Sequence, residues 1–194
     1  MKKSIIVTGA ASLAVAAMPV VGVFAATGTT VTDTVQVTIN EACSITSTNT
    51  SNTYSKTMTN SQLLSSDDND GFGSTQMSIS CNNAGGWHLT AVGSGADSED
   101  KTAMNATGSG TDIATGTATS GNTSNWAMKV TGGTAIESFL SYRSVPSSAI
   151  DAAKSTVSTS GSVVNTGYRV WISATQQADT YTGQVTYTLA SPAT

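Results

Sequence analysis

The sequence predicts an all-β fold, a β-sandwich of the Greek-key or jelly-roll kind with one short helix at most and one disulfide. Three observations indicate this class. Apolar and polar residues alternate in several short segments, as in strands with one buried and one solvated face. Gly-, Asn- and Ser-rich turns separate these segments. Charged residues make up 10% of the chain, against ~25% in an average domain, so Ser, Thr, Asn and Gly supply the polarity.

The expected elements follow the chain in order. We expect strands over 31–39, near Ile45, and over 77–81, 87–92, 126–130, 170–174 and 181–189. The Asn- and Gly-rich residues 82–86 predict a hairpin between the third and fourth of these strands. Residues 147–154 are the expected short helix, and a turn is expected around 60–64. The low-complexity stretches 46–53 and 108–124 are predicted to be irregular surface chain.

Residues 1–25 are predicted to be a secretory signal peptide. Two lysines precede an uncharged run, 4–26, which ends on small or short side chains at Val23-Phe24-Ala25, where a signal peptidase cleaves. A retained transmembrane anchor is the alternative, because the run is long enough to span a bilayer. Helix-breaking residues just before the cleavage point disfavour that alternative. We therefore expect a single secreted domain over 26–194, with no membrane attachment after cleavage.

The predicted domain is acidic. It holds all 12 Asp and Glu but only six of the eight Lys and Arg, because Lys2 and Lys3 precede it, so its net charge is −6. A negative surface repels phosphate backbones, and we therefore expect no nucleic-acid partner. The weakly charged, hydroxyl-rich composition is typical of a secreted or cell-surface protein.

The two cysteines, Cys43 and Cys81, are expected to form one disulfide, as a lone pair does in an exported chain. Free thiols are the alternative, which an oxidising compartment disfavours. A metal site is a weaker alternative, since two Cys and one His without metal-ligand spacing fall short of a tetrahedral set. The bond would connect the N-terminal strands to the segment before residues 82–86.

Few residues suggest catalysis, and we expect a protein that is not an enzyme and has no cofactor. The only histidine, His88, alternates with Trp87 and Leu89 and is predicted to face solvent. No G-x-S-x-G nucleophile motif is present. The sequence has two acidic clusters, over residues 67–71 and 97–100. Their closely spaced acids are more typical of solvated loop tips than of the paired carboxyls of a glycosidase.

A calcium site is a weak candidate at residues 66–71. This run approaches the D-x-D-x-D-G calcium loop, with Asp68 and Asp70 as its candidate ligands. However, Ser66 replaces the first Asp and Met77 stands where the closing Glu should be. A bare acidic loop is the simpler interpretation.

The aromatic residues divide into two groups. Trp87, Trp126 and Tyr187 occupy the inward phase of their strands and are expected to be core residues. Trp171 alternates with Val170 and is expected either to be covered by a loop or to be exposed. An exposed Trp on a secreted domain is a candidate for stacking against a sugar ring.

Two segments resemble the WxL domain of Gram-positive surface proteins. Gly86-Trp87-His88-Leu89-Thr90-Ala91 resembles its first motif, and residues 178–192 resemble its C-terminal end, where a last strand carries the second W-x-L. The resemblance implies a secreted β domain attached non-covalently to the cell wall, with peptidoglycan as ligand. Trp87, Leu89, Tyr187 and Leu189 would be the signature, although Tyr187 replaces the second Trp.

The C-terminal stretch is also similar to spore-coat-U-like and pilin-like secreted sandwiches, which carry a paired Cys near the first strand. Two functions are therefore expected. The first is non-catalytic attachment to the bacterial cell wall, with a wall polymer or other surface proteins as partners. The alternative is a structural subunit of a surface layer, coat or pilus-like assembly, joined through strand edges.

Overall fold

The computed structural model describes residues 36–47, 54–67, 74–95, 100–132, 134–136 and 139–192, which form β-strands and loops without an α-helix. The strands are β1 (Cys43–Ser47), β2 (Gln62–Ser65), β3 (Ser74–Cys81), β4 (Trp87–Gly93), β5 (Asn105–Ala106), β6 (Ala114–Thr115), β7 (Asn125–Thr131), β8 (Ile150–Ser155), β9 (Thr159–Ile172), β10 (Tyr181–Thr182) and β11 (Val185–Ala190). The predicted signal peptide, 1–25, lies outside the described residues. Within them, no helix is long and apolar enough to cross a membrane.

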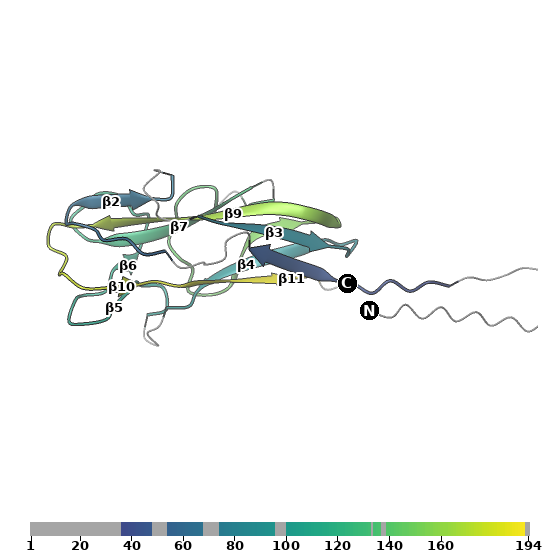
Figure 1. Ribbon diagram of the computed structural model, residues 1–194, viewed down its shortest axis with the longest axis horizontal. Coiled ribbons are helices and arrows are strands. Elements are labelled where there is room, and N and C mark those ends of the chain that lie inside the picture. The colour runs from purple at the N-terminus through teal and green to yellow at the C-terminus, as the bar shows by residue number, and fades with distance from the viewer. Residues whose placement is uncertain are drawn as a thin grey trace, which may run out of the picture. The chain divides into compact units, whose positions relative to one another are not determined.

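The larger sheet is organised around β9, its longest strand (Figure 1). Its strand order is β1-β3-β9-β7-β6, and β2 also pairs with β9. The first part of β9 pairs with β3 and its last four residues pair with β2, while β7 occupies the opposite edge. All these pairs are antiparallel except the short β6–β7 pair, which is parallel.

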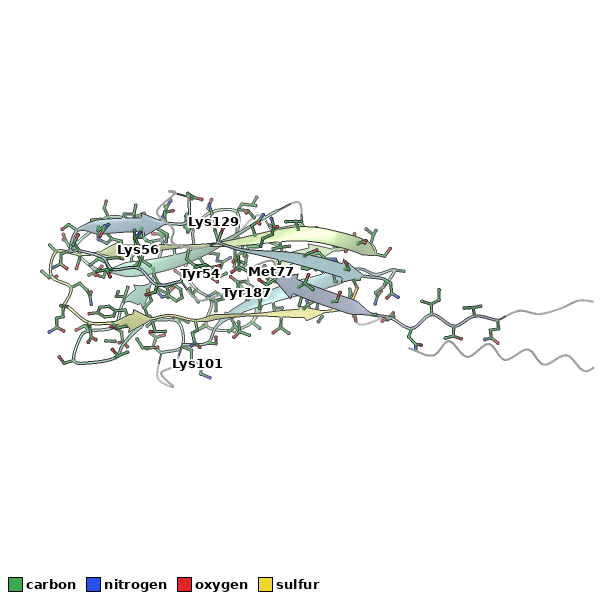
Figure 2. All side chains as sticks on the ribbon, in the orientation of Figure 1. Tyr54, Lys56, Met77, Lys101, Lys129 and Tyr187 are labelled. Carbon is green, nitrogen blue, oxygen red and sulfur yellow. A yellow bond between two sulfur atoms is a disulfide. The ribbon has the colours of Figure 1, made fainter. Side chains whose placement is uncertain are left out.

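The smaller sheet has the order β11-β4-β8, and β5 pairs with β10 separately. Its buried side chains and those of the larger sheet form one hydrophobic core, so the two sheets make a sandwich. The Tyr168 hydroxyl, from β9, lies 3.1 Å from that of Tyr187, from β11. Burial raises the pKa of both phenols, and that of Tyr187 lies well above its ordinary value. Figure 2 shows Tyr187 and Met77 between the sheets.

The predicted hairpin over 82–86 is wrong. β3 and β4 are not paired but belong to different sheets, so these residues carry the chain from one layer to the other. Both edges of β3 are occupied by β1 and β9, and both edges of β4 by β11 and β8. Cys81 and Trp87 are both buried at the two ends of this connection.

The predicted helix over 147–154 is also wrong, because residues Ile150–Ser155 form strand β8. Ala152 and Ala153 are fully buried, and β8 pairs with β4. The apolar residues 149, 150 and 153 fit a helical face, but the hydrogen bonds and burial that β4 offers outweigh this local preference.

The strand expected over 31–39 is not found in its described part. Residues 36–42 carry no regular secondary structure, and residues 31–35 lie outside the described ranges. Val37 and Ile39 are 78% and 81% exposed. The chain divides after residue 38 into two units, of which 39–194 contains all the strands.

Three other expectations need adjustment. Residues 170–172 are the end of the much longer β9, and the turn expected around 60–64 is confined to residues 60 and 61 before β2 begins. The strand expected over 181–189 is broken between β10 and β11. Gly183 occupies this break, and a Cβ there would lie 2.8 Å from the Trp126 ring.

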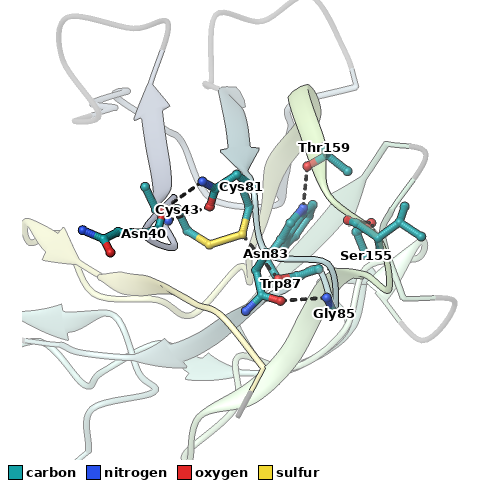
Figure 3. The surroundings of a disulfide bond; sticks show 12 residues. Asn40, Cys43, Cys81, Asn83, Gly85, Trp87, Ser155 and Thr159 are labelled. Atoms are coloured by element: carbon teal, nitrogen blue, oxygen red, sulfur yellow. Dashed lines mark hydrogen bonds between the residues drawn. A yellow bond between two sulfur atoms is a disulfide. The ribbon is translucent and has the colours of Figure 1, made fainter. Parts of the chain in front are cut away.

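The predicted disulfide between Cys43 and Cys81 is present (Figure 3). It connects two residues that face each other directly in the β1–β3 pair. Asn82 continues this pairing, since its backbone N–H donates to Ala42 O and its side-chain oxygen accepts from Ala42 N at 2.7 Å. The bond therefore secures the edge strand β1 to the body.

We predict that reduction of this disulfide lowers the free energy of unfolding by roughly 3–4 kcal/mol, because it frees a loop of this length in the unfolded chain. The bond spans a sequence separation of 38. Urea denaturation with and without a phosphine reductant measures the effect. The Cys43→Ala/Cys81→Ala variant is the control and should not respond to the reductant; an equal response would contradict the prediction.

Gly86 permits the crossing between the sheets. Its φ is +83°, and a Cβ there would lie on the Ser155 carbonyl, 2.8 Å from Val157 N. We predict that Gly86→Ala lowers the free energy of unfolding by roughly 2–4 kcal/mol, through strain and backbone overlap. Gly121→Ala is the matched control, because its Cβ would meet only Thr119 O at 3.9 Å. Equal urea midpoints for the two variants would refute this explanation.

Candidate functional site

The candidate site lies on the outer face of the larger sheet. Val170 and Ile172 of β9 point into the core, so the alternating residues Arg169 and Trp171 point outward. Lys129 takes the same outward phase on β7, opposite Gly167. Figure 2 shows Lys129 on this side of the body, whereas Lys101 lies on the opposite side.

Two cations contact one aromatic ring at this face. The Arg169 guanidinium carbon lies 3.9 Å from the centroid of the Tyr142 ring, and Lys129 Nζ lies 4.8 Å from it. The Tyr142 hydroxyl is within 3.0 Å of Ser65 Oγ and 2.8 Å of Ser66 Oγ. Cation–π contacts of this kind hold charged side chains in place over a ring.

Asp67 completes this group, and we call Asp67, Lys129, Tyr142 and Arg169 the Tyr142 cluster. Its carboxylate pairs with Lys129 and lies 3.7 Å from an Arg169 nitrogen. The hydrogen bond from Lys129 is the main cause that lowers the pKa of Asp67. Two cations against one carboxylate leave one net positive charge on an otherwise acidic domain.

Gly167 makes room for the cluster. A Cβ at Gly167 would overlap the Ser66 hydroxyl and lie 3.1 Å from Lys129 Cε. Because Gly167 has no side chain, the Ser66 hydroxyl and the aliphatic part of Lys129 can lie over β9 at this position, where both contact Tyr142. Here the glycine serves a close approach and not an unusual backbone angle.

The cluster lines a surface depression of about 360 Å³. Its other lining residues are Thr117, Thr119, Leu140 and Ser141. Hydroxyl groups and cations around a ring can hydrogen-bond a polar, negatively charged ligand. The depression contains no histidine, because the only one, His88, lies on β4 with its Nδ1 3.0 Å from Asp151.

Trp171 lies on the same face as Arg169 and is neither fully buried nor fully exposed. Its Nε1 donates to the carbonyl of Gly121 at 3.0 Å, so the loop before β7 covers part of the ring. Both expectations for this residue are thus partly met. Its proposed stacking on a sugar remains a prediction.

The WxL-like residues lie in the body of the fold and not at the candidate site. Trp87 and Leu89 have no exposed surface, and Trp87 Nε1 donates to Thr159 Oγ1 at 2.8 Å. Leu89 faces Leu189 directly across the β4–β11 pair, and Tyr187 lies two residues earlier on the same face. The structure therefore brings the two motif segments together as paired strands.

The calcium candidates Asp68 and Asp70 lie outside the described residues. Their described neighbour Asp67 is already paired with two cations. Within the described ranges, no three His, Cys, Asp or Glu side chains gather as a potential metal site.

A second carboxylate organises the loop 107–110. Asp179 accepts hydrogen bonds from the backbone N–H groups of Gly108, Gly110 and Thr180 at 2.7–3.1 Å. These bonds, first that from Gly110, lower the pKa of Asp179. The Gly-Ser-Gly sequence at 108–110 thus directs its backbone N–H groups at an anion, and that anion is the chain's own Asp179 carboxylate.

No protein-family model matches the chain, and neither a curated protein nor a solved structure matches it significantly. The resemblance to WxL domains therefore rests on the two motif segments alone.

Tyr142, Lys129 and Arg169 were not among the site residues predicted from the sequence. Arg169 could have been found from its phase, because it lies two residues before Trp171 on one strand. Tyr142 lies in a loop with no local pattern, and only the fold brings it to the two cations.

We predict that acid destabilises the protein below about pH 4. The pKa values of Asp67, Asp100 and Asp179 are lowered in the folded state. Their stabilisation is complete above the unfolded pKa of about 3.9 and is lost as the pH falls through the folded values.

Asp179→Asn provides the test. Its melting temperature should lie below that of the wild type at pH 7, and the difference should shrink as both are measured towards pH 2. Glu41→Gln, which also removes one exposed carboxylate, is the control for net charge. A wild-type-to-variant difference that is constant across this range would contradict the prediction.

Proposed function

We propose that this protein is a non-catalytic cell-surface protein that attaches non-covalently to the bacterial cell wall, with a negatively charged wall polymer held at the Tyr142 cluster. The single observation that carries the proposal is the pairing of Arg169 and Lys129 over one ring in a hydroxyl-lined depression. The WxL-like motifs and the predicted signal peptide support the same location.

Charge favours such a ligand at this face. The predicted domain has a net charge of −6, so it repels anions over most of its surface. The Tyr142 cluster carries a net positive charge, and its cations are 18% and 27% exposed for Lys129 and Arg169. A polyanion would therefore be directed to this face.

The neighbouring side chains suit a sugar-containing polymer. Thr117, Thr119 and Ser141 can donate to and accept from sugar hydroxyls. Trp171 follows Arg169 on the same face of β9, and its ring supplies an apolar surface beside the charge. A repeating polymer can also engage many copies of the protein, which strengthens weak single contacts.

Retention on purified cell-wall sacculi tests the proposal. We predict that Arg169→Ala or Lys129→Ala weakens binding at least about ten-fold, as expected for one charge-assisted hydrogen bond. Asp67→Asn should strengthen binding, because it removes the compensating negative charge, and all binding should weaken with salt. Lys101→Ala is the matched control, since it removes one charge on the opposite side of the body.

The outcomes separate the parts of the proposal. Equal binding by Arg169→Ala and Lys101→Ala would show that the Tyr142 cluster is not the binding site. Unchanged binding by Trp171→Ala would remove only the stacking contact. Circular dichroism of each variant checks that the fold is retained.

A further inference from the structure

The outer face of the larger sheet continues beyond the Tyr142 cluster towards the beginning of β9. Two rows of uncharged side chains follow there, all in the outward phase of their strands, because the alternating residues Met77, Val130 and Val164 are buried. These side chains are Gln76, Asn165 and Thr131 in the first row, and Thr46, Ser78 and Val163 in the second. We call these six residues the uncharged face.

The uncharged face is a neutral region on an acidic domain. Figure 1 shows β1, β3 and the first part of β9 side by side, at the end of the larger sheet away from β2. β1, β3 and β9 as far as Tyr168 contain no charged residue. The predicted domain has a net charge of −6, so an anionic polymer is repelled over much of the surface but not here.

A pair of amide groups forms the first row. Gln76 Nε2 donates to Asn165 Oδ1 at 3.2 Å, which holds the two side chains next to each other. The Asn165 N–H groups have no hydrogen-bond partner among the described residues, so they can donate to a ligand. The hydroxyl of Thr131, which lies directly opposite Asn165 on β7, can both donate and accept.

The second row adds an apolar surface to these polar groups. Val163 is 42% exposed and lies directly opposite Ser78. Sugar rings combine apolar C–H faces with hydroxyl groups at their edges, and a valine among hydroxyl and amide groups fits both. One valine is too small to hold a second copy of the chain, because a stable interface buries about 800 Å² on each partner.

A ligand at the Tyr142 cluster can reach the uncharged face if it is a polymer. Asn165 lies four residues before Arg169 and Val163 lies six before it on β9. At the rise of a β-strand these separations are about 13 Å and about 20 Å. Both exceed the size of one sugar ring, whereas a chain of several sugars aligned with β9 spans them.

We propose that the wall polymer is bound along β9 in an extended conformation, with its anionic group at the Tyr142 cluster and its neutral sugar units over the uncharged face. The inference rests on the proposed function and specifies the ligand as a linear glycan with neutral units next to charged ones. Asn165 and Val163 are its further binding residues. Binding then has an ionic part, which salt screens, and a neutral part, which salt leaves almost unchanged.

Retention on purified cell-wall sacculi tests the neutral part. We expect Val163→Asp to weaken binding at least about ten-fold, because it places a carboxylate under an anionic polymer and removes the apolar contact. Val157→Asp is the matched control, since it adds the same charge at an exposed valine in the connection before β9. This control should bind within about two-fold of the wild type.

The salt dependence of binding distinguishes the two parts of the site. Asn165→Ala should weaken binding about three-fold or more, by the same factor at low and high salt, because it removes hydrogen bonds of a neutral group. The loss in Arg169→Ala should shrink as salt increases. Thr188→Ala, at an exposed and uncharged position of β11 in the smaller sheet, is the control and should bind like the wild type.

The outcomes separate this inference from the proposed function. If Arg169→Ala binds weakly while Val163→Asp equals Val157→Asp, the uncharged face is not part of the site and the proposed function stands. A loss in Asn165→Ala that shrinks with salt as in Arg169→Ala would also overturn the inference. A wild type that is not retained on sacculi would overturn both. Circular dichroism of each variant confirms that the fold is retained.

Discussion

The fold depends on β9, which joins the other long strands of the larger sheet through both of its edges. Its fourteen residues pair with β3 and then β2 on one side and with β7 on the other. One face of this strand supplies the core residues Val164, Thr166 and Val170, and the other supplies Arg169 and Trp171. Any slip of register by one residue would exchange these two faces, so the core and the candidate site are fixed together.

The alternation in the sequence identified the strands that are half-buried and regular. The strands that hold Trp87, Leu89 and residues 126–130 were located correctly, because their large apolar side chains recur at every second position and are buried. The connection over 82–86 was misread, since a hairpin and a crossing between sheets both need a turn of Asn and Gly. Only the pairing of distant strands distinguishes the two, and among the described strands no antiparallel pair joins neighbours in sequence.

The candidate site could be predicted only in part, because it too depends on contacts between segments that are distant in the sequence. Trp171 was recognised from its phase, but Asp67, Lys129 and Tyr142 come from three separate segments. Nothing in their local sequence indicates that they meet. The Ala-rich β8 shows the same limit for secondary structure, because its partner β4 lies more than fifty residues away and decides its conformation.

The disulfide determines how mechanical tension would pass through the protein. Cys43 opens the first strand, and its covalent partner Cys81 lies in β3, which is paired with β9. A pull on the chain before Cys43 is therefore transferred by the sulfur–sulfur bond into the interior of the larger sheet. The hydrogen bonds of β1 and the residues between the two cysteines lie outside this force path. Resistance to extension then rests on the strands that follow Cys81 in the chain, beginning with β4 and its pairing with β11 and β8.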